Sequence, residues 1–194
     1  MTKRILALLA IGQILFYSCH ISHDKEIICQ YKFKKASELA YNNPTNKVAL
    51  DSALTILNNC MQCDSIKKSV VDLKILLLIT IGKFKEGADF VDSLKSSDFV
   101  YPYKRNLYHD NFIALDFALI KDSIRRDSVF REMANRLENY INENKLESKE
   151  FQEAYLDLFS IKENFLDSTI INQEVDSLTR KYPDNAQFFD FLKH

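Results

Sequence analysis

The sequence predicts an all-α protein, and three observations support this fold class. First, the 194 residues include only 3 Gly and 3 Pro, about a quarter of ordinary usage, so the turns of an all-β fold are missing. Second, apolar residues recur every three or four positions along most of the chain, which is the period of a helix. Third, no segment alternates strictly over six residues, and no Asn-Gly or Asp-Gly hairpin turn occurs.

The composition excludes several broad classes of protein. Hydrophobic residues make up 46% and charged residues 27% of the chain, which excludes a disordered, collagenous or multi-span membrane protein. The length allows one domain with a short tail. A net charge of −1 provides no broad positive field, so we expect no nucleic-acid partner.

The N-terminus has the features of an export signal. Lys3 and Arg4 precede an apolar stretch, Ile5–Tyr17, of 13 residues. This stretch is too short to span a bilayer, which needs about 20 apolar residues, but it fits a secretory signal. Polar residues do not recur along this stretch in a pattern that would form a polar helix face. A buried N-terminal helix of the domain is therefore the weakest interpretation.

The end of this stretch resembles the lipobox of bacterial lipoproteins. Residues 15–19 read Leu-Phe-Tyr-Ser-Cys, with residues bulkier than the strict pattern has before Ser18, as in the loose boxes of Bacteroidota. The resemblance implies cleavage after Ser18, acylation of Cys19 by palmitate-like chains, and stable anchoring in a membrane. His20 is not the Asp of an inner-membrane retention signal, which implies the outer membrane. An ordinary cleaved signal and an uncleaved anchor remain alternatives.

The rest of the chain is expected to be divided by breakers into antiparallel helices. We expect residues 1–18 to be the signal peptide, 19–25 a polar tether, and 26–194 a helical domain. The residues expected to end or begin successive helices are Pro44, Asp64, Gly82, Pro102, Asp127 or Ser128, Ser148, Asp167 or Ser168, and Asp184.

The predicted helices pair as hairpins with turns near residues 44, 83, 124 and 167. The intervals between these turns are 39, 41 and 43 residues, a range typical of helical-repeat arrays. In such an array each hairpin buries its second face on the next one. The third helix, which ends near Ile81, has almost no polar face and is expected to be interior.

Three segments resemble tetratricopeptide repeats. Residues 82–88 resemble the turn within a repeat, with Gly82 as the helix cap, Phe84 in the turn and Gly87 allowing close helix approach. Residues 182–186 resemble the junction between repeats, and 47–54 a repeat's second helix. The resemblance implies antiparallel hairpins stacked as a short α-solenoid, with a groove lined by the first helices. The alternative is a compact helical bundle.

Two of the four cysteines form a Cys-x-x-Cys motif, Cys60 and Cys63. In an oxidising compartment they could form a local disulfide, with Cys29 left as an odd thiol. Free thiols are the alternative, since Cys60 lies on the apolar stripe of its helix. Redox catalysis would need a thioredoxin-like sheet, and zinc would need further ligands, for which Cys29 and His109 have no recognisable spacing. We therefore expect no metal and no cofactor.

An aromatic and basic cluster is the candidate partner-binding patch: Tyr101, Tyr103, Lys104, Arg105 and Tyr108. Packing between consecutive hairpins is its alternative role. The basic residues from Lys121 to Arg136 are interrupted by acidic ones, so a solvated mixed-charge face is favoured over a phosphate site. Phe188, Phe189, Phe191 and Leu192 are expected to cap the array.

No catalytic motif occurs, so the sequence predicts a protein that is not an enzyme. We expect a lipid-anchored cell-envelope protein that presents a helical-repeat surface to a protein or peptide partner. Two alternatives remain open: an envelope binding protein for a small molecule or glycan, and an immunity or inhibitor protein against a secreted toxin.

Overall fold

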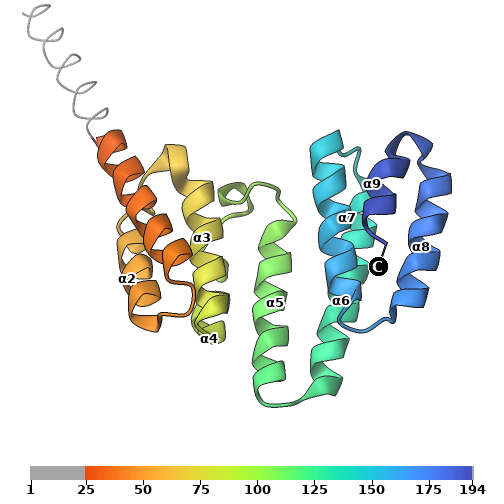
Figure 1. Ribbon diagram of the computed structural model, residues 1–194, viewed down its shortest axis with the longest axis horizontal. Coiled ribbons are helices and arrows are strands. Elements are labelled where there is room, and N and C mark those ends of the chain that lie inside the picture. The colour runs from red at the N-terminus through yellow and green to blue at the C-terminus, as the bar shows by residue number, and fades with distance from the viewer. Residues whose placement is uncertain (1–24, 194) are drawn as a thin grey trace, which may run out of the picture. The chain divides into compact units, whose positions relative to one another are not determined.

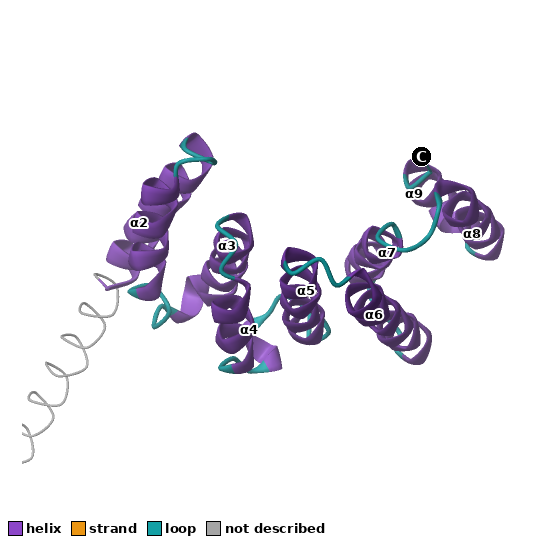
Figure 2. Cartoon of the chain, turned by 90° about the horizontal axis from the view of Figure 1, so that it is seen from below, coloured by secondary structure: helices purple, strands orange, loops and turns teal. Residues whose placement is uncertain are grey.

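The computed structural model describes residues 25–193, and this part of the chain consists of helices joined by short loops, without a β-strand (Figure 2). The predicted all-α class is confirmed. The chain forms two compact units, one ending at Gly82 and the other beginning at Lys83. The expected signal peptide at 1–18 and the acylated Cys19 lie outside the described residues, as does most of the tether.

Between residue 25 and Gly82 the first unit contains three helices. Residues 25–42 form the first, α2 spans Lys47–Asn58, and α3 spans Lys67–Thr80 after a 3₁₀ turn at Asp64–Ile66 (Figure 1). Pro44 lies in the turn before α2, and Asn46 caps α2 by accepting hydrogen bonds from the backbone N–H groups of Val48 and Ala49. Asp64 begins the 3₁₀ turn rather than α3 itself.

The third helix is largely buried, as predicted, although Leu76 is 48% exposed. Six of its apolar side chains are nearly inaccessible: Val70, Val71, Leu73, Ile75, Leu77 and Leu78. Gly82, which follows its end, has a φ of +74°. This left-handed conformation is the one expected of a glycine after a helix C-terminus.

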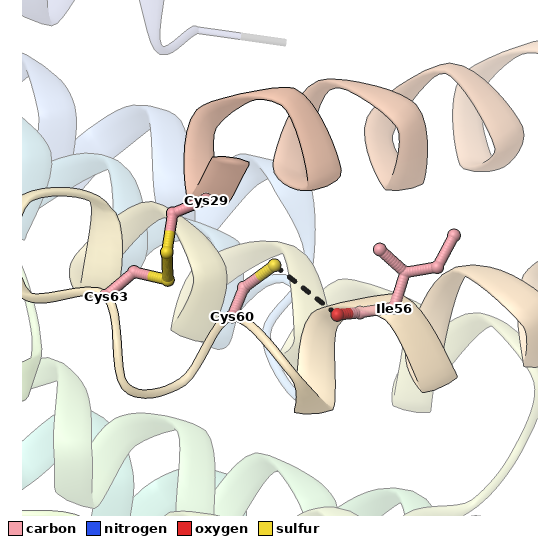
Figure 3. The surroundings of a disulfide bond; sticks show 4 residues. All are labelled: Cys29, Ile56, Cys60 and Cys63. Carbon is pink, nitrogen blue, oxygen red and sulfur yellow. Dashed lines mark hydrogen bonds between the residues drawn. A yellow bond between two sulfur atoms is a disulfide. The ribbon is translucent and has the colours of Figure 1, made fainter. Parts of the chain in front are cut away.

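A disulfide ties the first helix of this unit to the segment after α2, and it corrects the predicted pairing. The bridge joins Cys29 to Cys63, whereas Cys60 is a free, buried thiol (Figure 3). Cys60 Sγ points away from the bridge and donates a hydrogen bond to the Ile56 carbonyl oxygen at 3.4 Å (Figure 3). Cys63 has extended backbone angles beyond the helical turn, so its side chain reaches Cys29 instead of Cys60.

The second unit contains six helices. Their bounds are α4 Phe84–Asp92, α5 Lys104–Leu119, α6 Ser123–Glu143, α7 Ser148–Lys162, α8 Ser168–Lys181 and α9 Ala186–Phe191 (Figure 1). Short 3₁₀ turns at Ser96–Asp98 and Pro183–Asn185 precede α5 and α9. In sequence order α4 packs on α5, α5 on α6, and α6 on α7.

Helix α6 begins earlier than the sequence predicts. Its N-cap is Asp122, whose carboxylate accepts a hydrogen bond from the backbone N–H of Arg125, so the predicted caps Asp127 and Ser128 lie inside the helix. Asp122 and Asp127 are both residues of a type that caps helices, and Asp122, the one nearer α5, is the cap in the structure. The α5–α6 turn is consequently tighter than expected.

Gly87 allows a close helix approach, but the approaching partner is α5. A Cβ atom placed at Gly87 would lie 2.2 Å from the ring of Phe112, which is fully buried. The close approach at this small residue therefore joins α4 to the following helix, and not the two helices of the predicted repeat.

The last two long helices do not form a simple hairpin, because α9 lies between α7 and α8 at one end (Figure 1). Phe189 of α9 is fully buried against Tyr155 and Phe151 of α7 and against Tyr182. Phe191, by contrast, is 79% exposed. The predicted capping role thus falls on Phe189 and the mostly buried Leu192.

Candidate functional site

The second unit contains a groove between α5 and α7, with α6 as its floor. Its volume is about 160 Å³. Polar side chains line its walls, namely Tyr108 and Asn111 from α5, Asp157 and Ser160 from α7, and Asn164 from the turn after α7. Apolar side chains line the rest: Leu107, Phe130, Met133 and Ile161. We refer to this feature as the α5–α7 groove.

Asp157 holds the two walls of the groove in place. Its Oδ2 accepts a hydrogen bond from the Tyr103 hydroxyl at 2.7 Å and pairs with Lys104 Nζ at 2.6 Å. Lys104 Nζ also lies 3.5 Å from a carboxylate oxygen of Glu153. Because these contacts join the start of α5 to the middle of α7, the spacing between the walls is set by buried or half-buried polar bonds.

The environment of Tyr103 keeps its phenol protonated. Burial raises its pKa strongly, and the neighbouring Asp157 carboxylate adds to the shift by charge repulsion and by accepting the phenolic hydrogen bond. Tyr103 therefore acts as a permanent donor to Asp157 at neutral pH. The Tyr101 ring stacks on Tyr103, with centroids 6.0 Å apart.

The residues of the predicted aromatic and basic patch thus make different contacts. Tyr103 and Lys104 join α5 to α7, and this contact corresponds to the alternative role of packing between consecutive hairpins. Arg105 bonds back to α4 and its following loop, donating to the carbonyl oxygens of Leu94 at 2.9 Å and Asp92 at 3.2 Å. Tyr108 is the one patch residue that lines the groove itself.

A second, smaller cavity of about 120 Å³ lies between α5 and α6. The rings of Tyr103 and Tyr140 border it, and Leu107, Met133 and Leu137 line it. The Tyr140 hydroxyl donates to Glu150 at 2.7 Å. Burial, followed by this hydrogen bond, raises the pKa of Tyr140 to about 12.

His109 lies between two carboxylates, of which Asp110 lines this cavity. Its Nε2 is 3.4 Å from Asp92 Oδ2, and its Nδ1 is 3.1 Å from Asp110 Oδ1. Asp110 also pairs with Arg136. His109 and Asp110 therefore belong to a chain of charges across α4, α5 and α6. Within residues 25–193 no group of three or more His, Cys, Asp or Glu could hold a metal ion.

A buried lysine of α7 links α6 to α8 in the second unit. Lys162 is only 6% exposed and pairs with Glu138 of α6 and Glu174 of α8. A buried ammonium is tolerated because two carboxylates compensate its charge. This triad lies across three helices and is best explained as structural.

Sequence reasoning missed the groove residues Asn111, Asp157, Ser160 and Asn164. All four are polar and lie on helices or, for Asn164, in the turn after α7, where nothing in the sequence separates a groove wall from an ordinary solvated face. The only available signal was spacing: Asp157 and Ser160 are three residues apart and so share one face of α7.

None of the helices formed by the described residues combines the length and apolar character needed to cross a membrane. No protein-family model, curated protein or solved structure matches this chain.

Proposed function

We propose that this is a lipid-anchored cell-envelope protein whose α5–α7 groove binds a segment of a protein partner without catalysis. The α5–α6 hairpin and the following helix α7 stack in the manner of tetratricopeptide repeats, as a short α-solenoid. The groove lies between α5 and α7, where a stacked array would present its concave face.

The composition of the α5–α7 groove is the observation that carries this proposal. Asn111 offers an amide and Ser160 a hydroxyl on the two walls, and these groups suit the backbone of an extended peptide. The amide N–H group of Asn164 already donates to the carbonyl oxygens of Ser160 and Ile161, so this side chain contributes its own carbonyl oxygen as an acceptor. Phe130 and Met133 provide an apolar floor for a side chain. The charged pair in the wall, Lys104 with Asp157, is already satisfied, so the groove favours a partner without a strong charge.

The Cys29–Cys63 disulfide supports the proposed export. Disulfides persist in oxidising compartments such as the bacterial periplasm and the cell surface, and are rare in the cytosol. The bridge is therefore consistent with the secretory signal and with acylation at Cys19.

The two cavities are small for a soluble ligand. Their volumes of about 120 and 160 Å³ lie below the roughly 300–1,000 Å³ usual for small-molecule pockets. This comparison favours a macromolecular partner over a free small molecule or glycan. A toxin held by an immunity protein is one such partner.

A cross-linked pull-down from intact envelopes tests the groove. Ser160→Arg places a long cation in the groove, and Ser177→Arg makes the same change at an exposed position on α8. The proposal predicts a discrete partner captured by the wild type and by Ser177→Arg, and lost with Ser160→Arg. Equal capture by both variants would contradict it.

Membrane fractionation tests the anchor separately. Cys19→Ala should release the protein from membranes washed with alkaline carbonate, because the acyl chains supply the attachment. If Cys19→Ala stays in the washed membrane, the lipoprotein proposal is wrong, whatever the pull-down shows.

A further inference from the structure

The first helix of the first unit exposes three large apolar side chains in its first two turns (red to orange in Figure 1). Ile27 is 53% exposed, Ile28 52% and Tyr31 68%, whereas the buried residues of this helix are the small Ala36 and Ala40. An ordinary surface helix turns its larger apolar side chains towards the core. We call Ile27, Ile28 and Tyr31 the N-terminal apolar face.

The disulfide fixes which side of this helix faces outward. Cys29 is held against the rest of the unit by its bond to Cys63. Ile27 and Tyr31 lie two residues before and two residues after Cys29, which is about 200° of rotation around the helix axis. Both therefore lie on the side opposite the bridge, and their exposure follows from the covalent structure rather than from a choice of rotamer.

The charge of the chain is divided unevenly along its length. Residues 25–82 contain 8 Lys and Arg against 5 Asp and Glu, whereas residues 83–194 contain 16 against 21. The overall charge of −1 therefore combines a basic first unit with an acidic second unit. Around the N-terminal apolar face, residues 25–38 contain four lysines and two glutamates.

Three of these four lysines have no carboxylate partner within the described part of the chain. They are exposed, and they are Lys25, Lys32 and Lys35. The fourth, Lys34, lies 3.9 Å from Glu38, and both side chains are mostly exposed. A pair of this kind is weak, so it leaves the basic character of the surface in place.

The unpaired lysines lie beside the apolar side chains. Lys32 follows Ile28 by four residues and Lys35 follows Tyr31 by four, so each ammonium lies one helical turn from a member of the N-terminal apolar face. Long cationic stems next to exposed apolar side chains are typical of surfaces at the boundary between lipid headgroups and acyl chains.

The length of chain that precedes the first helix indicates which surface this face meets. Five residues separate Cys19 from Lys25. Even a fully extended chain would span at most about 22 Å over this stretch. Tyr31 lies only about 9 Å further along the helix axis. An acyl anchor at Cys19 would therefore keep the N-terminal apolar face close to the bilayer, whose phosphates match the lysines in charge.

We propose that the N-terminal apolar face lies on the anionic bilayer that holds the Cys19 anchor. Its three apolar side chains enter the boundary between headgroups and acyl chains, and the ammonium groups of Lys32 and Lys35 lie among the phosphates. This inference rests on the proposed anchor and is independent of the α5–α7 groove. Because the tether raises the local concentration of the face at the membrane, a weak contact suffices.

Tryptophan fluorescence on vesicles tests the proposal. The chain contains no Trp, so a single introduced Trp reports only on its own surroundings. Tyr31→Trp places this reporter in the N-terminal apolar face, and Phe191→Trp places it at a position of α9 that is 79% exposed.

The chain from Cys19 onward is coupled through the Cys19 thiol to a maleimide lipid in vesicles of phosphatidylethanolamine with phosphatidylglycerol. Cys60 is buried and does not compete for the maleimide. Since the coupling replaces acylation, the result does not depend on whether cells acylate Cys19, which the membrane fractionation of Cys19→Ala decides.

Coupling to these vesicles should shift the emission of the Tyr31→Trp protein to shorter wavelength, and brominated acyl chains should quench it. Phe191→Trp should show neither change. Added salt should reverse both changes, because exposed charges are screened. Lys32→Glu together with Lys35→Glu should abolish them, whereas Lys85→Glu together with Lys149→Glu, at exposed positions of the second unit, should not.

Three outcomes would overturn the proposal. One is an emission of Tyr31→Trp that coupling to anionic vesicles leaves unchanged. Another is the same shift and quenching on vesicles of phosphatidylcholine alone, because the lysines would then have no part in the contact. The third is a shift that occurs without vesicles and grows with protein concentration, because a second copy of the chain would then cover the face.

Discussion

Gly87 lies where α4 crosses α5 so closely that a side chain has no room. The nearest atom to its absent Cβ would be a ring carbon of Phe112 at 2.2 Å. A substitution of glycine by alanine within an open helix normally stabilises the fold by about 1 kcal/mol. Here we expect Gly87→Ala to destabilise it by about 1–3 kcal/mol through overpacking.

Urea unfolding of Gly87→Ala measures this effect, and Phe112→Leu provides its control. The double variant should lose less stability than the sum of the two single variants, because the smaller side chain relieves the clash. Stabilisation by Gly87→Ala alone would contradict the close approach of α4 to α5.

Tyr140 and Tyr103 make the fold sensitive to alkaline pH. The pKa of Tyr140 rises from 10.0 to about 12 on folding, so between these values the folded state holds its proton more tightly than the unfolded state. Stability should therefore be unaffected below pH 10 and fall as the pH rises from 10 towards 12. The pKa of Tyr103 is shifted in the same direction.

Unfolding free energies measured between pH 8 and about 11.5 test this sign. Tyr140→Phe loses its hydrogen bond to Glu150 at all pH values, so the slope with pH is compared rather than the absolute stability. The variant should show a shallower alkaline decline than the wild type. An unchanged slope would mean that Tyr140 ionises as freely in the folded state as in the unfolded one.

At the scale of elements, the disulfide fastens the first helix to the segment after α2. Cys29 and Cys63 are separated by 34 residues, and closing a loop of this length stabilises a fold by about 4 kcal/mol in the chain-entropy account. Cys29→Ser should lower the unfolding free energy of the first unit by about that amount. Reductant should have the same effect on the wild type.

Peptide mapping without reductant identifies the bridge directly. The expected product links the peptide with Cys29 to the peptide with Cys63, and leaves Cys60 available for alkylation only after unfolding. Burial raises the pKa of the Cys60 thiol, with Lys32 acting weakly in the opposite direction, which further slows its reaction. A peptide linked between Cys60 and Cys63 would contradict the structure.

Helix α9 is expected to stabilise the second unit through one side chain. Phe189 is fully buried, and Phe191, two residues later, is 79% exposed. Phe189→Ala should cost about 3–5 kcal/mol of unfolding free energy, whereas Phe191→Ala should change it by less than about 0.5 kcal/mol. Thermal unfolding of the two variants compares them, and similar losses would mean that α9 does not lie between α7 and α8.

The sequence predicted elements better than the contacts between them. Helical periodicity, Pro44, Gly82 and Asp167 located most helix boundaries, because helix formation and capping are local. Asp167 does accept a hydrogen bond from the Ile170 N–H at the start of α8. Local patterns do not encode which segments of the chain meet in space. They therefore could not predict the disulfide partner of Cys63, the helix that packs on Gly87, or the position of α9.

At the scale of the whole molecule, the two units differ in their proposed tasks. The first unit, with its disulfide, follows the proposed anchor, and the second contains the α5–α7 groove. The polar walls of the groove were not separable in the sequence from solvated helix faces. The proposed role in partner binding depends on the structure for its location and on the N-terminal resemblance for its compartment.

Site-specific photo-cross-linking in intact cells tests the central claim most directly. A photoreactive amino acid is placed at Ser160 in the groove or at Ser177 on the exposed surface of α8. The account predicts one discrete cross-linked protein, present in the envelope fraction, from position 160 and none from position 177. The same product from both positions, or no product from position 160, would contradict binding through the α5–α7 groove.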